Sequence, residues 1–377
     1  MNCPLGRYRE SNCHNCHNPK QTPRLKKFPI GDDRFLSQAR SNRPPIFVRV
    51  LNYVEQVHLQ NLLLGELLTM WLKFGVAPSG ELTSIDEVVR GKTQLTCLYC
   101  GGGLTAKKGS VKEHHFAHTE ETCKPVSQRI KTKAFPSLPL YDNFTIQLKG
   151  EELEQLKVLW KEYGAQKRSI PKDLVNFRWQ LKGLLESEGS RSYHFTDLGK
   201  IPVGALPLAL FNKVQEPLLL SELMKLEGSV EIAEAAGLSC LEERQADLLI
   251  YRAQLRRILV NSLYFLEVKA DENTFYKIGI TTRQIEERIA EVQRDVRAHY
   301  SDVIINLLGL WEHRGNVELY FKHRYQPFNY RIGKLTEYFV FPFVKAVQQD
   351  LYEMKPKVLS DIELDAIDGM SANNTAG

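Results

Sequence analysis

The stretch "YFLEVKADENTFYKIGITTRQIEER", residues 264–288, decides the fold of the C-terminal part of this chain. It predicts a β-hairpin that leads into a helix. We expect an apolar strand over 262–268, a polar turn over 269–273 and a returning strand over 274–280. A glycine inside a strand weakens it and usually marks the close approach of another group. Gly279 therefore predicts such a close approach in this hairpin.

Side chains in a strand alternate between the two faces of a sheet. In the first strand of the hairpin, Tyr264 therefore shares a face with the next two alternate apolar residues, Leu266 and Val268. In the returning strand, Lys277 lies on the same face as Gly279, and Tyr276 lies on the opposite face.

The helix after the hairpin has one apolar face. Its apolar residues recur at helical spacing, namely Ile285, Ile289, Val292 and Val296. At 100° per residue, Arg288 lies about 70° from the centre of this stripe. Its side chain is therefore expected at the rim of the helix, where it can lean over the sheet.

A third strand is expected over 302–313, followed by a second helix that begins near Val317. The buried stripe of that helix is expected to comprise Val317, Phe321, Tyr325 and Phe328. Glu318 lies at its rim. The sequence "TEYFVF", 336–341, would close a sheet of three or four strands, and 343–354 is expected to be a final helix.

This arrangement predicts that Tyr264, Arg288 and Glu318 meet at one edge of a small sheet. A phenol, a guanidinium and a carboxylate together suit the hydrolysis of phosphodiesters. The carboxylate would hold a divalent metal, the guanidinium would stabilise the pentavalent phosphate, and the phenol would relay a proton to or from the attacking water.

Over residues 262–345 the chain resembles the GIY-YIG endonuclease superfamily. "SLY", 262–264, stands where that superfamily has GIY, and "KIG", 277–279, stands where it has YIG. Arg288 and Glu318 match its arginine and its acidic residue. The resemblance implies a GIY-YIG-type endonuclease that cleaves DNA with one Mg²⁺ ion, held by Glu318.

The end of this region, "TEYF" with Glu337, is similar to the KIG-type branch, whose members end in Glu-Trp-Phe. Two positions depart from the superfamily pattern, because Ser262 replaces the first glycine and Lys277 replaces the second tyrosine. Lys277 is expected either to contact a phosphate or to help deprotonate Tyr264. Its presence also favours an alternative, a catalytically weak or inactive nucleic-acid-binding protein that uses the same fold as a scaffold.

The partner implied by the resemblance is DNA, with RNA as the alternative. Arg283 and Lys277 are the candidate nucleic-acid-binding residues. Arg283 is expected either to make a second phosphate contact or to take the place of Arg288. No recognition helix identifies a target sequence, and nothing in the chain indicates an oligomeric state.

A second group of functional residues lies in "CLYCGGGLTAKKGSVKEHHFAHTEETC", residues 97–123. A C-x2-C pair followed by glycines can place two sulfurs on one ion, and zinc needs four such ligands. The preferred set is Cys97, Cys100, His118 and Cys123, and His115 is a substitute for His118. With every position filled by protein, such a zinc would be structural.

The "HFAH" element of this segment resembles the front of competence-protein CoiA-like nucleases. That resemblance covers about 27 residues and implies a structural zinc finger near nucleic acid. Three further cysteines, Cys3, Cys13 and Cys16, are candidates for a second metal.

The composition is that of a globular protein with two or three domains. Residues 1–49 hold ten Lys or Arg and three acids, so this arm carries +7 while the whole chain carries +5. Excess basic charge on an arm often indicates phosphate contact. A strand is expected over 46–51 and a buried helix over 61–77. No apolar run is long enough for a membrane span or a signal peptide, so we expect a cytoplasmic protein.

Together these patterns predict a multi-domain α+β fold, with a zinc knuckle near the N-terminus, a mostly helical middle region that is helical over 150–190 and 205–258, and a small sheet flanked by helices at the C-terminus. The expected divisions are a basic arm at 1–45, a zinc-binding segment at 46–135, a helical region at 136–260, a nuclease domain at 261–356 and a flexible tail at 357–377.

Overall fold

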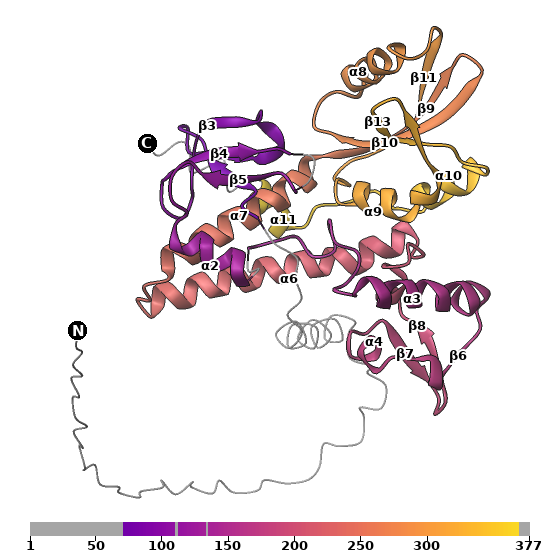
Figure 1. The fold of residues 1–377 in the computed structure, drawn as a ribbon, viewed down its shortest axis with the longest axis horizontal. Helices are drawn as coiled ribbons and strands as arrows, with labels where there is room; N and C mark the ends of the chain where they lie inside the picture. The colour runs from indigo at the N-terminus through magenta and orange to yellow at the C-terminus, as the bar shows by residue number, and fades with distance from the viewer. Residues whose placement is uncertain (1–70, 110–111, 133–134, 369–377) are drawn as a thin grey trace, which may run out of the picture. The chain divides into compact units, whose positions relative to one another are not determined.

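A computed structural model describes residues 71–109, 112–132 and 135–368. They form helices and three antiparallel sheets, which confirms the α+β class (Figure 1). The basic arm expected over 1–45, with its three cysteines, and the strand expected over 46–51 lie outside the described residues. Among the helices that the structure describes, none combines the length and the apolar character needed to cross a bilayer.

The first sheet carries the cysteine segment, and its strand order is β2-β1-β3-β4-β5. The elements are β1 (Phe74–Val76), β2 (Leu82–Ser84), β3 (Gly91–Thr96), β4 (Gly103–Lys107), β5 (His115–His118) and helix α2 (Lys124–Thr132). Side chains such as Leu104 and Phe116 form a small core beneath the sheet. We call residues 71–132 the cysteine module.

The helix expected over 61–77 is wrong at its C-terminal end, because β1 lies there. Val76 pairs with Leu82 across a tight turn in which Gly80 has a φ of +86°. A glycine adopts this backbone conformation readily, and the turn sets the direction of the chain at this point. Residues 61–70 lie outside the described part.

The middle region is not wholly helical, which corrects the expectation of helix over 150–190. It contains α3 (Gly150–Glu162), β6 (Ile170–Pro171), α4 (Phe177–Leu181), β7 (Leu185–Glu188), β8 (Ser192–Phe195) and α5 (Asp197–Lys200). The strands form a sheet of order β6-β8-β7. Gly189, with a φ of +74°, allows the turn that pairs Leu185 with Phe195, and both of these side chains are buried.

Two long helices, α6 (Leu208–Ala235) and α7 (Leu241–Val260), confirm the helices expected over 205–258. They pack against each other and are joined at Gly237, which has a φ of +58°. We call this pair the helical hairpin. Because α7 ends only two residues before the strand that carries Tyr264, the helical hairpin leads directly into the C-terminal domain.

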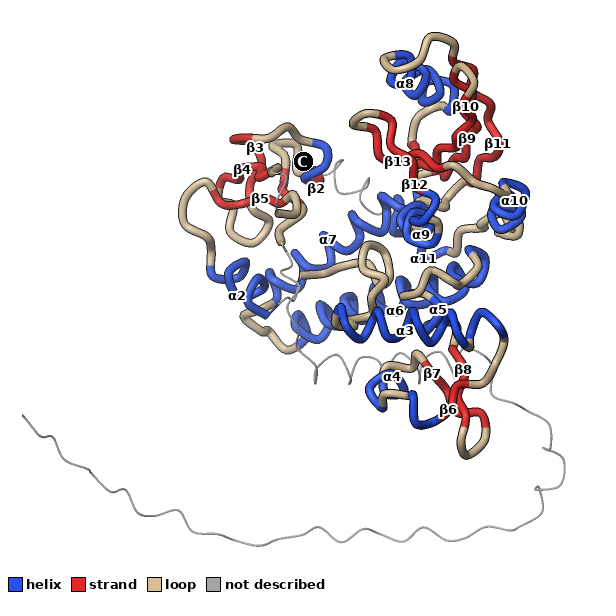
Figure 2. Tube along the Cα trace, turned by 45° about the vertical axis from the view of Figure 1, so that its right-hand side comes forward, coloured by secondary structure: helices blue, strands red, loops and turns tan. Residues whose placement is uncertain are grey.

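The C-terminal domain, residues 262–352, is built on a sheet of order β11-β9-β10-β13-β12. Its elements, with the helix that follows the domain, are β9 (Ser262–Ala270), β10 (Asn273–Thr281), α8 (Ile285–Arg297), β11 (Val303–Trp311), α9 (Val317–Arg324), β12 (Asn329–Ile332), β13 (Leu335–Phe339), α10 (Val344–Tyr352) and α11 (Asp361–Asp368). The two faces of this sheet are covered by different helices (Figure 2). Helix α8 covers the face that carries Tyr264, and α9 and α10 cover the face that carries Tyr276. The alternation predicted for both strands is confirmed.

Several details differ from the expectation. The sheet has five strands because Gly333, with a φ of +56°, allows a hairpin between β12 and β13. The turn between β9 and β10 is shorter than expected and is centred on Asp271, with a φ of +50°. Phe328 is 38% exposed and Tyr320 is buried instead. The segment expected as a flexible tail from residue 357 contains α11, which packs on α7.

Candidate active site and metal centre

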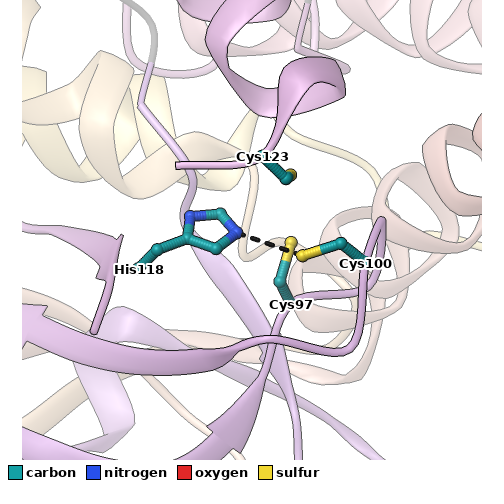
Figure 3. Close-up of side chains that lie close together, drawn as sticks. All are labelled: Cys97, Cys100, His118 and Cys123. Carbon is teal, nitrogen blue, oxygen red and sulfur yellow. Dashed lines mark hydrogen bonds between the residues drawn. The ribbon is translucent and has the colours of Figure 1, made fainter. Parts of the chain in front are cut away.

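Four side chains of the cysteine module form one cluster of possible metal ligands: Cys97, Cys100, His118 and Cys123 (Figure 3). Their ligand atoms all lie within 4.8 Å of one another. This is the only such group of three or more among the residues that the structure describes. Three thiols and one imidazole are a donor set that suits tetrahedral zinc.

The backbone of the C-x2-C loop explains how two of these sulfurs meet. The amide of Gly101 donates to the carbonyl of Cys97 at 2.7 Å, and Gly101 has a φ of +71°. The amide of Gly102 donates to Cys100 Sγ at 3.4 Å. A β-carbon at Gly102 would lie only 3.3 Å from that sulfur, so the loop closes tightly around the cluster.

The geometry distinguishes the two candidate histidines. His118 Nε2 lies 3.3 Å from Cys100 Sγ, whereas the ring of His115 stacks on Trp71 at 4.3 Å and its Nδ1 lies 2.8 Å from the carbonyl of Glu113. The two histidines are three residues apart in strand β5, so they point to opposite faces of the sheet. His118 therefore belongs to the cluster and His115 does not.

In the C-terminal domain, Tyr264 and Gly279 are paired directly across strands β9 and β10. A β-carbon at Gly279 would lie 2.3 Å from Tyr264 Oη, a distance that no real contact allows. The glycine therefore makes room for the phenol to lie across the neighbouring strand. This confirms the prediction that the strand glycine marks a close approach.

Arg288 reaches the phenol from helix α8. Its Nε donates to Tyr264 Oη at 3.0 Å, and its Nη1 donates to Glu291 at 2.7 Å. Glu291 also accepts two hydrogen bonds from Arg283, at 2.5 and 2.9 Å. One carboxylate thus fixes both arginines, with Arg288 directed at the phenol and Arg283 more exposed.

Tyr264 is fully buried, and burial raises the pKa of its phenol although the hydrogen bond from Arg288 opposes that rise. The phenol therefore carries its proton at neutral pH. Glu318 and Glu337 lie close enough to raise the pKa further by electrostatic repulsion. The side chain of Arg288 is 28% exposed and lies at the edge of this buried group.

Glu318 belongs to a row of alternating charges at the same site. Lys322, one turn along α9, places Nζ 3.0 Å from Glu318 and 2.6 Å from Glu337. The second oxygen of Glu337 accepts from Lys277 at 3.0 Å. The order is therefore Glu318, Lys322, Glu337 and Lys277, and the members come from α9, β13 and β10.

The row determines the charges of its members. Burial alone would raise the pKa of Glu337, but the attraction of Lys277 and the hydrogen bond from Lys322 lower it to about 2. Burial lowers the pKa of Lys277, and Glu337 counteracts part of that effect. Glu337 is thus ionised over a wide pH range and is the acidic partner that accepts from Lys277.

The start of α9 is anchored on the helical hairpin. Asn316 is buried, and its Nδ2 donates to Asn212 at 2.8 Å and to Gln215 at 2.9 Å, both on α6. A β-carbon at Gly315 would lie 2.6 Å from a backbone oxygen of α7. These contacts fix the start of the helix that carries Glu318.

One comparison with known proteins gives a match to the C-terminal domain. The family model of the T5orf172 domain matches residues 261–362. This is a nuclease-associated domain family, so the C-terminal domain is nuclease-like. No curated protein and no solved structure matches the chain.

Within the C-terminal domain, the structure joins Tyr264 directly to Arg288 and connects Glu318 to Lys277 through two intermediate side chains. The sequence motifs predict no role for Glu337 and do not include Lys322. The i, i+4 spacing of Glu318 and Lys322 on one helix is a signal for their pairing.

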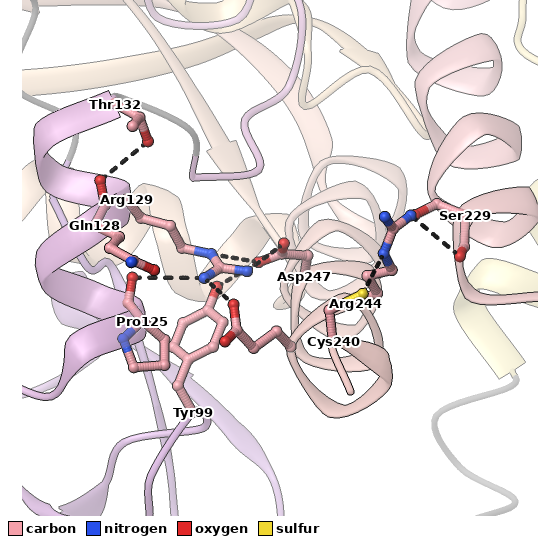
Figure 4. A network of polar contacts seen from close by, with 10 residues as sticks. Tyr99, Pro125, Gln128, Arg129, Thr132, Ser229, Cys240, Arg244 and Asp247 are labelled. Atoms are coloured by element: carbon pink, nitrogen blue, oxygen red, sulfur yellow. Dashed lines mark hydrogen bonds and ion pairs between the residues drawn. The ribbon is translucent and has the colours of Figure 1, made fainter. Parts of the chain in front are cut away.

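The cysteine module is held on the helical hairpin by a polar cluster (Figure 4). Arg129 is buried and makes two hydrogen bonds to Asp247, at 3.0 and 2.7 Å, and one to Glu243 at 2.9 Å. Tyr99 donates to Asp247 at 2.6 Å. Tyr99 lies between the two cysteines of the C-x2-C pair, and Arg129 lies on the helix that follows Cys123. One contact with α7 therefore starts from the C-x2-C loop, and the other starts from the helix next to Cys123.

Proposed function

We propose that the T5orf172 domain of this chain is a metal-dependent endonuclease that hydrolyses phosphodiester bonds in DNA. The observation that carries the proposal is the hydrogen bond from Arg288 to Tyr264 Oη, in a space that only a glycine at 279 leaves open. Glu318 is close enough for its charge to raise the pKa of the Tyr264 phenol.

The residues present suit a single Mg²⁺ ion that the substrate helps to hold. Mg²⁺ is commonly bound by one or two carboxylates together with substrate phosphates and water. Glu318 would hold the ion, and the ion would offset the negative charge that develops on the phosphate. With one such carboxylate on α9, the protein supplies a partial set of ligands, which fits an ion that binds together with the substrate.

Four side chains of the domain would act on the phosphodiester. Arg288 would stabilise the charge on the phosphate oxygens through the N–H groups of its guanidinium that neither Tyr264 nor Glu291 uses. The phenol of Tyr264 would relay a proton: its own proton would pass to the leaving oxygen and it would accept one from the attacking water, so that it is unchanged after the reaction. Lys277 and Arg283 would bind neighbouring phosphates. To do so, Lys277 would replace its hydrogen bond to Glu337 with one to a phosphate oxygen.

The metal cluster of the cysteine module is proposed to bind zinc and to have a structural role. The Cys97, Cys100, His118 and Cys123 side chains lie close enough together to fill the four positions of a tetrahedral zinc, which would leave none for a substrate. Because Tyr99 lies in the C-x2-C loop and Arg129 lies on the helix that follows Cys123, zinc would stabilise the docking of the cysteine module on α7. The module would thereby aid nucleic-acid binding by the chain.

The test is nicking of supercoiled plasmid in the presence of Mg²⁺ by the wild-type chain and by Glu318→Gln, which keeps the shape of the side chain. We expect the wild type to nick and the variant to lose at least a hundredfold in rate. Equal nicking by both proteins, or none by either with varied divalent metals, would count against the proposal.

One observation favours a second function, nucleic-acid binding without cleavage. Lys277 stands at the position of a motif tyrosine and is tied to Glu337. Under this alternative the wild type fails to nick plasmid with Mg²⁺ or Mn²⁺, binding falls steeply with salt, and Glu318→Gln binds as well as the wild type.

A further inference from the structure

The ammonium group of Lys322 lies between two carboxylates of the proposed active site. It is 3.0 Å from Glu318 and 2.6 Å from Glu337. An i, i+4 ion pair on a helix surface is weak, and by itself it holds neither side chain in one position. The second carboxylate, on strand β13, holds Lys322 over the sheet, so Glu318 is held there as well.

The charges of this group balance one another. Glu318 and Glu337 carry one negative charge each, and Lys322 and Lys277 carry one positive charge each. A divalent cation approaching Glu318 therefore meets a carboxylate that is already neutralised, with an ammonium group on the oxygen that it would bind. Like charges a few ångströms apart repel each other measurably even in water, so the ammonium group should lower the affinity of Glu318 for a divalent cation.

We propose that Lys322 is a positioning residue that acts as a built-in counter-cation for Glu318. It aligns the carboxylate and keeps its affinity for a divalent cation low until a phosphodiester is present. The inference rests on the proposed function, because it concerns the cation that Glu318 is proposed to hold. It adds an order to the reaction, in which tight cation binding requires the substrate.

The surroundings of Lys322 favour this role. Its side chain is only 24% exposed, and its second partner, Glu337, also accepts from the nearly buried Lys277. A phosphodiester that enters beside Arg288 brings a negative charge that Lys322 can meet. Lys322 can then release Glu318 to the cation while it keeps its contact with Glu337.

The experiment is calorimetric titration of Mn²⁺ into the full-length, zinc-saturated protein without nucleic acid, with Glu318→Gln as the baseline that identifies the site. We expect Lys322→Met to bind Mn²⁺ roughly tenfold more tightly than the wild type, because one positive charge near the ion is removed. Lys322→Arg keeps the charge and should retain the weak affinity of the wild type.

Glu337→Gln tests the same idea in the opposite direction. Without its second partner, Lys322 should pair more closely with Glu318, and Mn²⁺ affinity should fall several-fold. Thermal unfolding of each variant identifies any that fails to fold, and either variant alone then decides the matter. Equal affinities for wild type and Lys322→Met, or weaker binding by Lys322→Met, would overturn the inference.

Plasmid nicking by the same proteins separates this result from the proposed function. Nicking that depends on Glu318, together with unchanged Mn²⁺ affinity in Lys322→Met, removes the role of Lys322 and leaves the nuclease standing. Absence of nicking together with the expected change in affinity supports Lys322 as a counter-cation and counts against the nuclease.

Discussion

Gly279 and Tyr264 face each other across the first two strands of the C-terminal sheet, and the phenol occupies the space of a missing side chain. The tyrosine lies across its neighbour strand because the glycine has no β-carbon. This brings Oη to Arg288 on helix α8. The pairing therefore connects a local feature of one strand with the geometry of the proposed active site.

The first prediction concerns this glycine. Gly279→Ala should destabilise the protein by about 1–3 kcal/mol, because the added methyl displaces Tyr264 from a packed position. It should also reduce nicking, since Oη moves away from Arg288. The matched control is Gly228→Ala in the interior of α6, where a β-carbon meets nothing within 4 Å. That change should stabilise by up to about 1 kcal/mol. Urea unfolding measures both, and equal effects would contradict the argument.

The second prediction concerns the hydroxyl of Tyr264. Tyr264→Phe should slow nicking at least a hundredfold, because the proton relay is lost. It should change the free energy of unfolding by only about 0.5–1.5 kcal/mol, the contribution of one hydrogen bond. Tyr276→Phe, one strand away and on the opposite face, is the control and should nick like the wild type. A Tyr264→Phe protein with full activity would exclude the phenol from the reaction.

Local patterns in the sequence predict the contacts of Tyr264, Gly279 and Arg288. Alternation in a strand and the 100° step of a helix are fixed by backbone geometry, so the relation of these three residues follows from their spacing. The contact of Glu337 with Lys322 depends on how strand β13 lies against helix α9. That relation is set by packing across the whole domain, so no short sequence pattern predicts it.

The choice between His115 and His118 shows how much depends on identifying an element correctly. When the segment is treated as a loop, either histidine can face the metal. Once 115–118 is recognised as a strand, His118 must share a face with Phe116, which is buried in the core. The small sheet of the middle region was missed for a related reason, because its strands are only two to four residues long.

The third prediction tests the metal cluster. His118→Ala should reduce bound zinc below one ion per chain at equal protein concentration and lower the melting temperature, because a structural zinc contributes to the stability of its fold. His115→Ala should retain zinc, since that ring stacks on Trp71 and lies outside the cluster. Elemental analysis of the purified proteins gives the answer. Equal zinc loss in both variants would show that the ligand set is wrong.

The fourth prediction concerns the contact between the cysteine module and α7. Asp247→Ala removes both charged bonds to Arg129 and leaves a buried guanidinium with Glu243 as its one remaining ionic partner, which should cost about 3 kcal/mol. Glu154→Ala, in an exposed pair with Lys157, is the control and should change stability by less than about 1 kcal/mol. Limited proteolysis should cut the module faster in Asp247→Ala. Equal stability of the two variants would mean that the cluster does not hold the module.

The fifth prediction is a pH dependence that arises at Glu337. Its pKa is lowered to about 2 in the folded protein from an ordinary value of 4.5, so the unfolded chain binds this proton more readily. The resulting stability is fully present above pH 4.5 and is lost as the pH falls from 4.5 toward 2. Glu337→Gln should therefore be less stable than the wild type at pH 7, and the difference should shrink progressively below pH 4.5. Urea unfolding between pH 3 and pH 7 measures that difference, and a value that stays constant over the range would show that Lys277 and Lys322 do not hold Glu337 in its ionised form.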